Sequence, residues 1–241
     1  MRHSRRIAAI GLLAKAFGSI AAPAALAGTY ATTPTFEVTV TNLTDGQWFT
    51  PPAAATHTRG FDAFSVGRTA SDGIRQIAEN GDLGPFTAAL DSSRSVSDWV
   101  VAPASEELPP LGPGQSVTFT IESTGGARLL SYASMLICTN DGFTGADGLR
   151  LPTRIGHTTT DYGRAYDAGT EVNTEAWADL VPPCAQLTGF GDQGGTGASN
   201  PELSENGKVR VHRGISGSAD LVPSVHGWSG PVSKIEVTRI G

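Results

Sequence analysis

The segment Thr35-Phe36-Glu37-Val38-Thr39-Val40-Thr41-Asn42 decides the fold class of this chain. Its residues alternate between apolar and polar, which is the period of a β-strand with one buried face. Similar alternation recurs at residues 116–121, 208–212 and 232–238, and the longer apolar run 129–138 indicates a central strand. Turn-forming glycine and proline residues separate these segments. The pattern predicts a mainly β protein, an antiparallel β-sandwich.

One or two short helices are predicted in the connections. Apolar residues between 70 and 78 fall at helical spacing, Ser71 is suited to cap the helix, and Gly81 is suited to end it. Residues 84–91 form a second, weaker helix candidate, and residues 173–180 are expected to form another turn. Residues 187–206 are rich in Gly, Ser and Asn, so we expect a loop there.

The first 27 residues predict a secretory signal peptide. Residues 1–6 carry three arginines, an apolar stretch follows, and Ala25-Leu26-Ala27 provides a cleavage site with small residues. The alternative is a retained membrane anchor, but Lys15 interrupts the apolar run and leaves it too short to span a bilayer. We therefore expect residues 1–27 to be removed and residues 28–241 to form one domain.

The charge of the mature chain is acidic. The whole chain carries a net charge of −6, and the signal segment holds four basic residues and no acid, so its removal leaves −10. A nucleic-acid partner is not expected, because the sequence has no cluster of Lys and Arg. An acidic balance suits an exported protein and is compatible with cation binding.

Cys138 and Cys184 are the two cysteines of the chain. An even number of cysteines in an exported protein predicts a disulfide, which would stabilise the fold by roughly 3–4 kcal/mol. The alternative is a pair of buried free thiols. The bridge would close a loop that contains both of the acidic segments described next.

Two short acidic segments carry the functional prediction: residues 140–145 (Asn-Asp-Gly-Phe-Thr-Gly) and 166–171 (Tyr-Asp-Ala-Gly-Thr-Glu). Each follows a predicted strand and combines carboxylates with small residues. If both lie at one end of the sandwich, Asp141, Asp167 and Glu171 would supply the oxygen ligands that Ca²⁺ prefers. Asp147 and Asp161 would complete the shell or simply solvate the loops. The alternative is that these residues only form turns.

Enzymatic motifs are absent from the sequence. We find no HExxH, Walker loop, GxSxG elbow or dinucleotide-binding GxGxxG. Residues 214–218 (Gly-Ile-Ser-Gly-Ser) come nearest to a nucleophile motif but lack its spacing. The histidines of the mature chain stand singly and are interpreted as surface or loop residues: His57, His157, His212 and His226. A metal-assisted hydrolase is therefore a minor hypothesis.

The same segments resemble the spondin N-terminal domain, the module shared by F-spondin and mindin. The similarity covers the helix at 70–81, the Ser-x-x-Ser-Met strand at 131–135, and the acidic segments at 140–145 and 167–171. It continues through His-x-Gly-Ile at 212–215 and Trp-x-x-Pro-Val at 228–232, so it covers nearly the whole mature chain. One departure is Gly142, which stands where the family usually has an aromatic residue.

The resemblance implies a C2-like sandwich that binds Ca²⁺ through loops at one edge, with Asp141 and Asp167 as ligands and Glu171 at the acidic position ending the motif. It also implies a role in extracellular adhesion or recognition. Taken together, we expect a secreted or periplasmic, non-catalytic, calcium-binding module, of bacterial type, whose partner is an extracellular or envelope protein or glycan. The alternative hypothesis is a structural envelope-associated protein whose acidic loops bind no metal.

Overall fold

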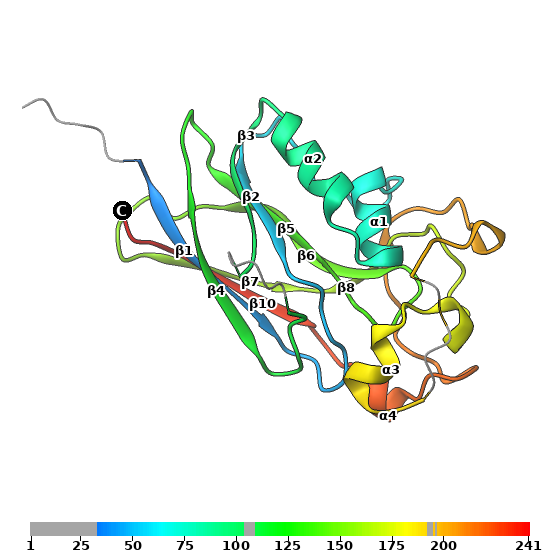
Figure 1. The fold of residues 1–241 in the computed structure, drawn as a ribbon. Coiled ribbons are helices and arrows are strands. Elements are labelled where there is room, and N and C mark those ends of the chain that lie inside the picture. The colour runs from blue at the N-terminus through cyan, green and yellow to red at the C-terminus, as the bar shows by residue number, and fades with distance from the viewer. Residues whose placement is uncertain (1–32, 104–108, 192–194, 196) are drawn as a thin grey trace, which may run out of the picture. The chain divides into compact units, whose positions relative to one another are not determined.

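The computed structural model describes residues 33–103, 109–191, 195 and 197–241. The predicted signal peptide, residues 1–27, lies outside the described residues. Within the described part, the strands form a four-stranded sheet in the order β4-β1-β10-β7 and a six-stranded sheet in the order β3-β2-β5-β6-β8-β9 (Figure 1). Every strand pair is antiparallel, so the predicted antiparallel β-sandwich is confirmed.

The strands are β1 (Thr35–Asn42), β2 (Ala53–His57), β3 (Val96–Val101), β4 (Ser116–Glu122), β5 (Leu129–Met135), β6 (Gly142–Arg150), β7 (Thr158–Gly163), β8 (Ala165–Asp167), β9 (Arg210–Val211) and β10 (Ser233–Arg239). The α-helices are α1 (Asp72–Asn80), α2 (Gly84–Ser92), α3 (Pro183–Thr188) and α4 (Pro223–His226), and short 3₁₀ turns are η1 (Trp177–Asp179) and η2 (Pro201–Leu203). None of these helices is long and apolar enough to cross a membrane.

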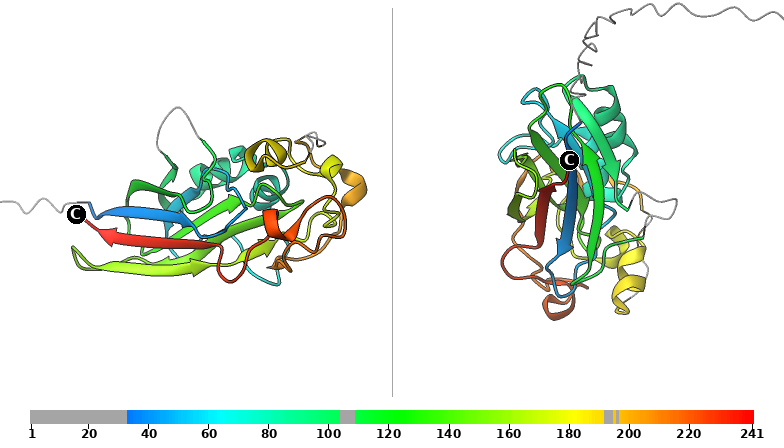
Figure 2. Two further views of the ribbon diagram at one scale, coloured as in Figure 1. Left: turned by 90° about the horizontal axis from the view of Figure 1, so that it is seen from below. Right: turned by 90° about the vertical axis from the view of Figure 1, so that its left-hand side faces the viewer.

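Strand β1 owes its position to the alternation in its sequence. Phe36, Val38 and Val40 are buried toward the second sheet, and the polar residues between them are more exposed. The strand lies between β4 and β10, with Val38 opposite both Phe119 and Val237 (Figure 2). These apolar side chains fill the space between the two sheets, where burial of apolar surface drives the packing.

Strands β2 and β5 are buried on both faces. Ala54 and Tyr132 belong to the core between the sheets, while Ala53, Ala55 and Met135 belong to a second core on the other face. Helices α1 and α2 cover this other face and contribute Ile74 and other apolar residues to the second core (Figure 1). Burial on both faces explains why most residues of β5 are apolar, and its two serines are buried with them.

Helix α1 begins and ends as its sequence predicts. The Ser71 hydroxyl accepts a hydrogen bond from the Ile74 N–H at 3.2 Å, and Gly81 ends the helix in the left-handed conformation at φ 68°. Helix α2 begins at Gly84, where the second helix is predicted. The turn predicted within 173–180 is η1.

The structure corrects the sequence-based picture of the first acidic loop. Residues 142–145 were predicted as loop, but they begin β6, and only residues 136–141 connect β5 to that strand. Gly142 is required in this position, because a Cβ there would lie 2.3 Å from Oγ1 of Thr139. Gly142 also donates its N–H to that hydroxyl at 2.9 Å. The turn therefore leaves no room for a side chain at Gly142.

The predicted disulfide is confirmed. Cys138 and Cys184 are bonded with an S–S distance of 2.08 Å, and both are fully buried. The bridge attaches α3 to the segment that follows β5. The interpretation as two free thiols is wrong.

Candidate functional site: paired acidic loops at the edge of β6 and β8

Strand pairing brings the two acidic segments together. Gly142, the first residue of β6, lies opposite Asp167, the last residue of β8. Next to this pair, the Ala168 N–H donates to the backbone oxygen of Asp141 at 3.0 Å. Asp141 and Asp167 therefore occupy one corner of the six-stranded sheet, as predicted.

The Asp141 carboxylate is buried and only half satisfied. Its Oδ2 accepts hydrogen bonds from the N–H groups of Thr170 (2.7 Å) and Glu171 (3.2 Å) and a longer one from the Thr170 hydroxyl (3.3 Å). Its Oδ1 is buried without any hydrogen-bond partner. Burial, and then the charge of Asp167, raise the pKa of Asp141 to about 6. A half-satisfied buried carboxylate is unusual and needs a physical explanation.

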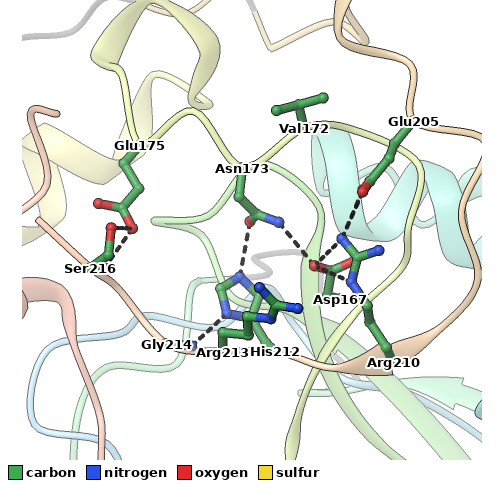
Figure 3. A pocket seen from close by; sticks show the side chains of 10 residues that line it. All are labelled: Asp167, Val172, Asn173, Glu175, Glu205, Arg210, His212, Arg213, Gly214 and Ser216. Carbon is green, nitrogen blue, oxygen red and sulfur yellow. Dashed lines mark hydrogen bonds and ion pairs between the residues drawn. The ribbon is translucent and has the colours of Figure 1, made fainter. Parts of the chain in front are cut away.

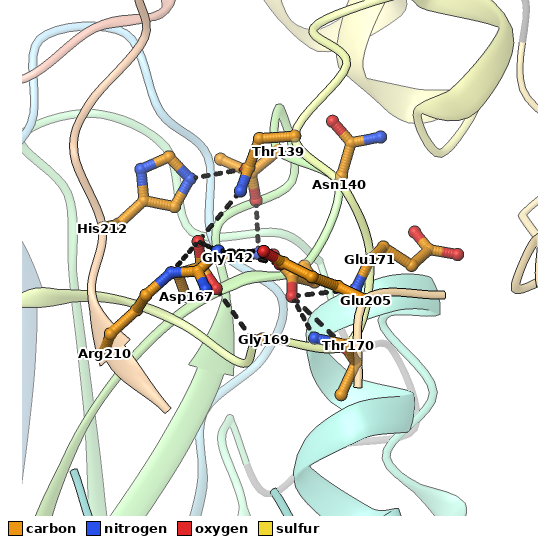
Figure 4. Close-up of polar contacts among 12 residues, drawn as sticks. Thr139, Asn140, Gly142, Asp167, Gly169, Thr170, Glu171, Glu205, Arg210 and His212 are labelled. Carbon is orange, nitrogen blue, oxygen red and sulfur yellow. Dashed lines mark hydrogen bonds and ion pairs between the residues drawn. The ribbon is translucent and has the colours of Figure 1, made fainter. Parts of the chain in front are cut away.

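The Asp167 carboxylate is better satisfied. Its Oδ1 accepts the Gly169 N–H at 2.8 Å, and its Oδ2 accepts the Asn173 amide at 2.9 Å. Oδ2 also forms an ion pair with Arg210, whose Nη2 lies 3.0 Å away (Figure 4). Arg210 pairs in turn with Glu205 at 2.8 Å. The guanidinium therefore neutralises one of the two aspartates.

Gly169 makes the second loop possible. It has φ of 70°, in the left-handed region, and a Cβ there would lie 2.5 Å from the backbone nitrogen of Lys208. Both restrictions require glycine. This turn points the N–H groups of the following Thr170 and Glu171 at Asp141.

The Glu171 side chain points away from Asp167 (Figure 4). Its Oε1 accepts the Asn200 N–H at 2.8 Å, and it lines a separate hollow of about 250 Å³ together with Glu79 and Asp179. Burial raises the pKa of Glu171 to about 7, with further contributions from neighbouring acids. The predicted third ligand therefore contributes its backbone N–H to Asp141 but directs its carboxylate elsewhere.

Asp147 and Asp161, the two acidic neighbours considered in the sequence, have other partners. Asp147 lies further along β6, where its Oδ1 accepts hydrogen bonds from the Ala63 N–H (2.9 Å) and the Ser131 hydroxyl (3.0 Å). Asp161 is exposed on β7 and accepts the N–H of its neighbour Tyr162 at 2.9 Å. Neither donates an oxygen to the corner of Asp141 and Asp167 in this arrangement.

The three predicted ligands do not form a compact group as they stand. Among the described residues, one group of three metal-ligating side chains has its ligand atoms within 4.8 Å of one another, and it is Cys138, Cys184 and His226. The acidic corner instead offers the two aspartates, backbone oxygens and amides. These donors are oxygen-rich and therefore suit a hard cation.

A hollow of about 430 Å³ adjoins the acidic corner (Figure 3). Asn173 stands at its centre, where its amide donates to Asp167 and its oxygen lies 3.1 Å from Nε2 of His212. Nδ1 of His212 accepts the Gly214 N–H at 3.0 Å, so the ring is neutral and its proton is on Nε2. Burial lowers the pKa of His212, which agrees with this assignment.

Glu175 is a site residue that sequence reasoning missed. Its carboxylate accepts hydrogen bonds from three consecutive backbone N–H groups, those of Ser216 (2.6 Å), Gly217 (2.8 Å) and Ser218 (3.0 Å). The segment considered as a nucleophile motif is therefore a carboxylate-binding loop. Its Ser-Gly-Ser composition, typical of loops whose N–H groups converge on an anion, was the available signal.

The histidines differ from their sequence interpretation. His57, His212 and His226 are buried, and His157 alone of the four is exposed. Nε2 of His57 lies 2.7 Å from the Ser131 hydroxyl, so this histidine is part of the polar network around Asp147. The interpretation as surface or loop histidines is wrong for His57, which lies in β2, and for His226, which lies in α4. His212 lies in the loop after β9 as expected but is buried, because isolated histidines in a sequence carry no pattern of burial.

The fold and the corner define a class: an antiparallel sandwich with two acidic loops joined at one edge. A family model described as Spondin_N matches residues 40–177, more than half of the 241-residue chain and including all three predicted ligands. The chain belongs to the Spondin_N family. No curated protein matches it. Family membership and the disulfide both indicate an extracellular setting.

Proposed function

We propose that this spondin-type domain is an exported recognition module that binds Ca²⁺ at its acidic corner and has no catalytic activity. Asp141 and Asp167 hold the ion, and Glu171 is the third carboxylate available to it. Bound Ca²⁺ supplies positive charge that neutralises the corner and orders its loops. The proposal concerns residues 140–145 and 166–171, which comprise the start of β6, the end of β8 and the loop residues next to them.

Oδ1 of Asp141 is the observation that carries the proposal. A buried carboxylate oxygen without a hydrogen bond costs free energy unless a cation or a donor compensates it. The nearby Asp167 raises the pKa of Asp141 further, so the corner is a place where added positive charge is favourable. The oxygen donors present fit a hard divalent cation.

The contacts of Asp167 with Arg210 and of Glu171 with Asn200 decide which side chains must move before an ion binds. Oδ1 of Asp167 has one N–H donor, from Gly169, and a carboxylate oxygen has two lone pairs, so this atom can accept a second partner. Oδ2 of Asp167 is held by Arg210, and Glu171 is held by the Asn200 N–H. For Glu171 to join the ion, its side chain must leave Asn200.

The adjoining surface suits a ligand that presents acidic groups. A second hollow of about 540 Å³ shares His212, Arg213 and Gly214 with the first. It is lined by Arg164 and Arg213 and by the aromatic rings of Tyr162 and Trp228, and none of the described residues that line it carries a carboxylate. Guanidinium groups bind carboxylates and sulfates bidentately, and aromatic faces stack on sugar or side-chain surfaces. We assign recognition of the extracellular ligand to this surface.

The test is calcium binding by the mature chain. Thermal unfolding and titration calorimetry with and without millimolar Ca²⁺ compare the wild type with Asp141→Asn and Asp167→Asn. A ligand at 100 times its Kd stabilises the folded state by about 2.7 kcal/mol, so the wild-type Tm is expected to rise by roughly 5–10 °C. Both variants are expected to lose this rise.

Asp161→Asn serves as the matched control, because Asp161 is exposed and its side chain contacts the N–H of its own neighbour. Its response to Ca²⁺ is expected to equal that of the wild type. A wild-type Tm that does not respond to Ca²⁺, or a full response in Asp141→Asn, would exclude this site.

The second candidate function is a structural protein whose acidic loops bind no metal. Two observations favour it: Arg210 already neutralises Asp167, and three donors already satisfy Oδ2 of Asp141. This candidate predicts a Tm that is independent of Ca²⁺ and depends mainly on the Cys138–Cys184 bridge.

Our proposal that the domain is non-catalytic rests on solvent access. Ser131 lies between His57 and Asp147, at 2.7 Å and 3.0 Å, whereas in a catalytic triad the histidine lies between the serine and the aspartate. Ser131 is only 1% exposed, and its hydroxyl also accepts the Gly148 N–H at 2.9 Å. A substrate cannot reach this oxygen, so the arrangement serves the fold. Turnover in a broad hydrolase screen with Ca²⁺ present would contradict this part of the proposal.

A further inference from the structure

The disulfide has a buried histidine beside it. His226, in α4, is fully buried, as are Cys138 and Cys184. One ligand atom from each of these three residues lies within 4.8 Å of the other two. The three come from different parts of the chain: the segment after β5, helix α3 and helix α4. None of them is a carboxylate of the acidic corner, and their ligand atoms are softer than carboxylate oxygens.

The His226 ring is fixed, but one of its nitrogens is unused. Nδ1 lies 3.0 Å from the N–H of Val222 and 3.2 Å from the backbone oxygen of the same residue. Trp177 and Phe190 contact the ring edge-on, with centroids 5.5 Å away in each case. Nε2 is buried without a hydrogen-bond partner. A buried, unsatisfied nitrogen in a ring that lies beside two sulfurs calls for a chemical explanation.

Gln47 holds the ligand residues together independently of the disulfide. Its amide nitrogen donates to the backbone oxygens of Cys138 (3.2 Å) and His226 (2.6 Å). Its amide oxygen accepts the Cys138 N–H at 3.1 Å. The backbones of two of the three residues therefore stay adjacent when the S–S bond is absent.

We propose that Cys138, Cys184 and His226 form a zinc site when the disulfide is reduced. Two thiolates and one imidazole nitrogen are ligands that Zn²⁺ prefers, with Zn–S near about 2.3 Å and Zn–N near about 2.0 Å. Tetrahedral geometry then places the ligand atoms roughly 3.5–3.8 Å apart. This spacing is compatible with ligand atoms that already lie within 4.8 Å of one another.

The surroundings of His226 fit a metal-bound form. Coordination through Nε2 requires the ring proton on Nδ1, where the backbone oxygen of Val222 at 3.2 Å accepts it, while the Val222 N–H, 3.0 Å from Nδ1, gives up that ring nitrogen as its acceptor. A metal-bound histidine commonly donates its second ring N–H to a carbonyl or carboxylate in this way. The metal would also give the unused Nε2 a partner.

The disulfide and the zinc site are alternative states of the same sulfurs. A phosphine reductant and one water convert the disulfide into two thiols, and the phosphine becomes its oxide. Zn²⁺ then binds both sulfurs as thiolates, and two protons leave to solvent. Oxidation of the two thiolates by a disulfide compound restores the S–S bond and releases the metal, and the two thiolates that leave the compound take up two protons from solvent to become thiols. The proposal does not depend on calcium binding.

The test uses Co²⁺ as a spectroscopic probe of the mature chain. Protein reduced by a phosphine without oxygen is expected to bind one Co²⁺ per chain, with sulfur-to-metal charge-transfer bands and the visible bands of tetrahedral cobalt. Zn²⁺ is expected to displace the Co²⁺ and to raise the Tm of the reduced chain by several degrees. The oxidised chain, which needs no substitution, is the first control and is expected to show neither effect.

Variants separate the histidine from the thiols. His226→Gln is expected to weaken Co²⁺ binding at least tenfold and to alter the visible bands, while the exposed His157→Gln is expected to leave both unchanged. Near-UV circular dichroism of each reduced variant checks that it is folded. The absence of tetrahedral bands in the reduced wild type, folded or unfolded, would overturn the proposal. So would a spectrum and affinity that are unchanged in a folded His226→Gln.

Discussion

At the scale of single residues, Asp141 and Glu171 hold raised pKa values in the fold, about 6 and about 7, against ordinary values of 3.8 and 4.5. Burial is the main cause in both cases. At a pH between the ordinary pKa and the raised pKa of either group, the folded state binds more protons than the unfolded state. The free energy of unfolding therefore falls as the pH rises through that range. Without Ca²⁺, these two groups therefore lower stability at neutral pH and lose that effect in mild acid.

The first prediction follows from this sign. For the wild type in EGTA, the contribution of Asp141 makes the free energy of unfolding rise as the pH is lowered from 7.5 to 5.5. Asp141→Asn removes the titrating group, so the difference between variant and wild type is expected to be largest at pH 7.5, at roughly 1–3 kcal/mol in favour of the variant. Urea unfolding across this pH range measures it. A difference that does not change with pH would show that Asp141 is ionised normally in the fold.

Gly142 gives the second prediction at this scale. A Cβ there would lie 2.3 Å from Oγ1 and 2.8 Å from Cβ of Thr139, so Gly142→Ala must displace the turn that carries Asp141. We expect it to cost about 1–3 kcal/mol of stability and to weaken calcium binding. Gly84→Ala is the control, because its Cβ would meet only the flexible end of Asp82, at 3.1 Å, at the start of helix α2. Equal effects of the two substitutions on unfolding would contradict the argument.

At the scale of elements, Glu175 attaches the segment after β8 to the loop after β9. Its hydrogen bonds to the Ser216, Gly217 and Ser218 N–H groups lower its pKa despite its burial. A lowered folded pKa stabilises the protein above the unfolded pKa, and this stabilisation is lost as the pH falls through the folded value. The stabilisation that Glu175 provides therefore decreases in acid, whereas the contribution of Asp141 makes the fold more stable there.

The third prediction concerns the hydrogen bonds between Glu175 and the loop after β9. Glu175→Gln keeps one oxygen acceptor but loses the charge, and we expect it to cost about 2–4 kcal/mol at pH 7. The cost is expected to disappear in acid, where Glu175 itself becomes protonated. Glu236→Gln is the control, because Glu236 forms a surface ion pair with Lys234 that is worth at most about 1 kcal/mol. Urea unfolding at pH 7, and at successively lower pH until the folded protein protonates Glu175, distinguishes the two.

The elements that sequence predicts well are those whose local pattern agrees with their burial. Strand β1 has one buried face and reads as alternation, and α1 carries both a serine cap and a terminal glycine. Strand β2 is missed because its sequence, Ala-Ala-Ala-Thr-His, has low β-propensity, and small residues are needed there between the opposite sheet and the helices. Strands β6 and β8 are missed because their glycine and aspartate residues are typical of turns. Their hydrogen-bonded pairing with each other places them in the sheet.

Some features of the candidate site could be predicted from sequence and others could not. Asp141 and Asp167 could be placed together from sequence, because each follows a strand signal and the family pattern includes both. The direction of the Glu171 side chain could not, since it depends on Asn200, a residue 29 positions away that donates to it. Arg210 could not be foreseen as the partner of Asp167 for the same reason, as their separation of 43 residues carries no local signal.

At the scale of the whole domain, packing on both faces of the six-stranded sheet fixes the acidic corner. Phe143, the second residue of β6, is fully buried in the core beneath the helices and contacts Phe64 and Tyr166 through its ring. Tyr166 precedes Asp167 on β8. The two acidic residues therefore extend from strands whose neighbouring positions are anchored in a core, which suits a preorganised binding site.

The disulfide acts on this corner from outside it. Cys138 and Cys184 are 46 residues apart, and the loop they close contains Asp141, Asp167 and Glu171. Closing a loop of this length restricts the unfolded chain and stabilises the fold by about 4 kcal/mol in the chain-entropy model. It also restricts the movement of α3, which follows the segment that holds Glu171 and Glu175. Calcium affinity and the redox state of the cysteines are therefore expected to be coupled.

The last prediction is the size and direction of that coupling. Cys138→Ala/Cys184→Ala is expected to lower stability by about 3–5 kcal/mol and, in the fraction that stays folded, to weaken calcium binding several-fold, because the loops no longer have a fixed end. Titration calorimetry of the oxidised wild type and the double variant below their Tm compares the two affinities. Because the variant has no thiols, zinc cannot restore either property, whereas zinc is expected to restore part of both in the reduced wild type. Equal calcium affinity in all these states would show that the corner is held by strands β6 and β8 alone.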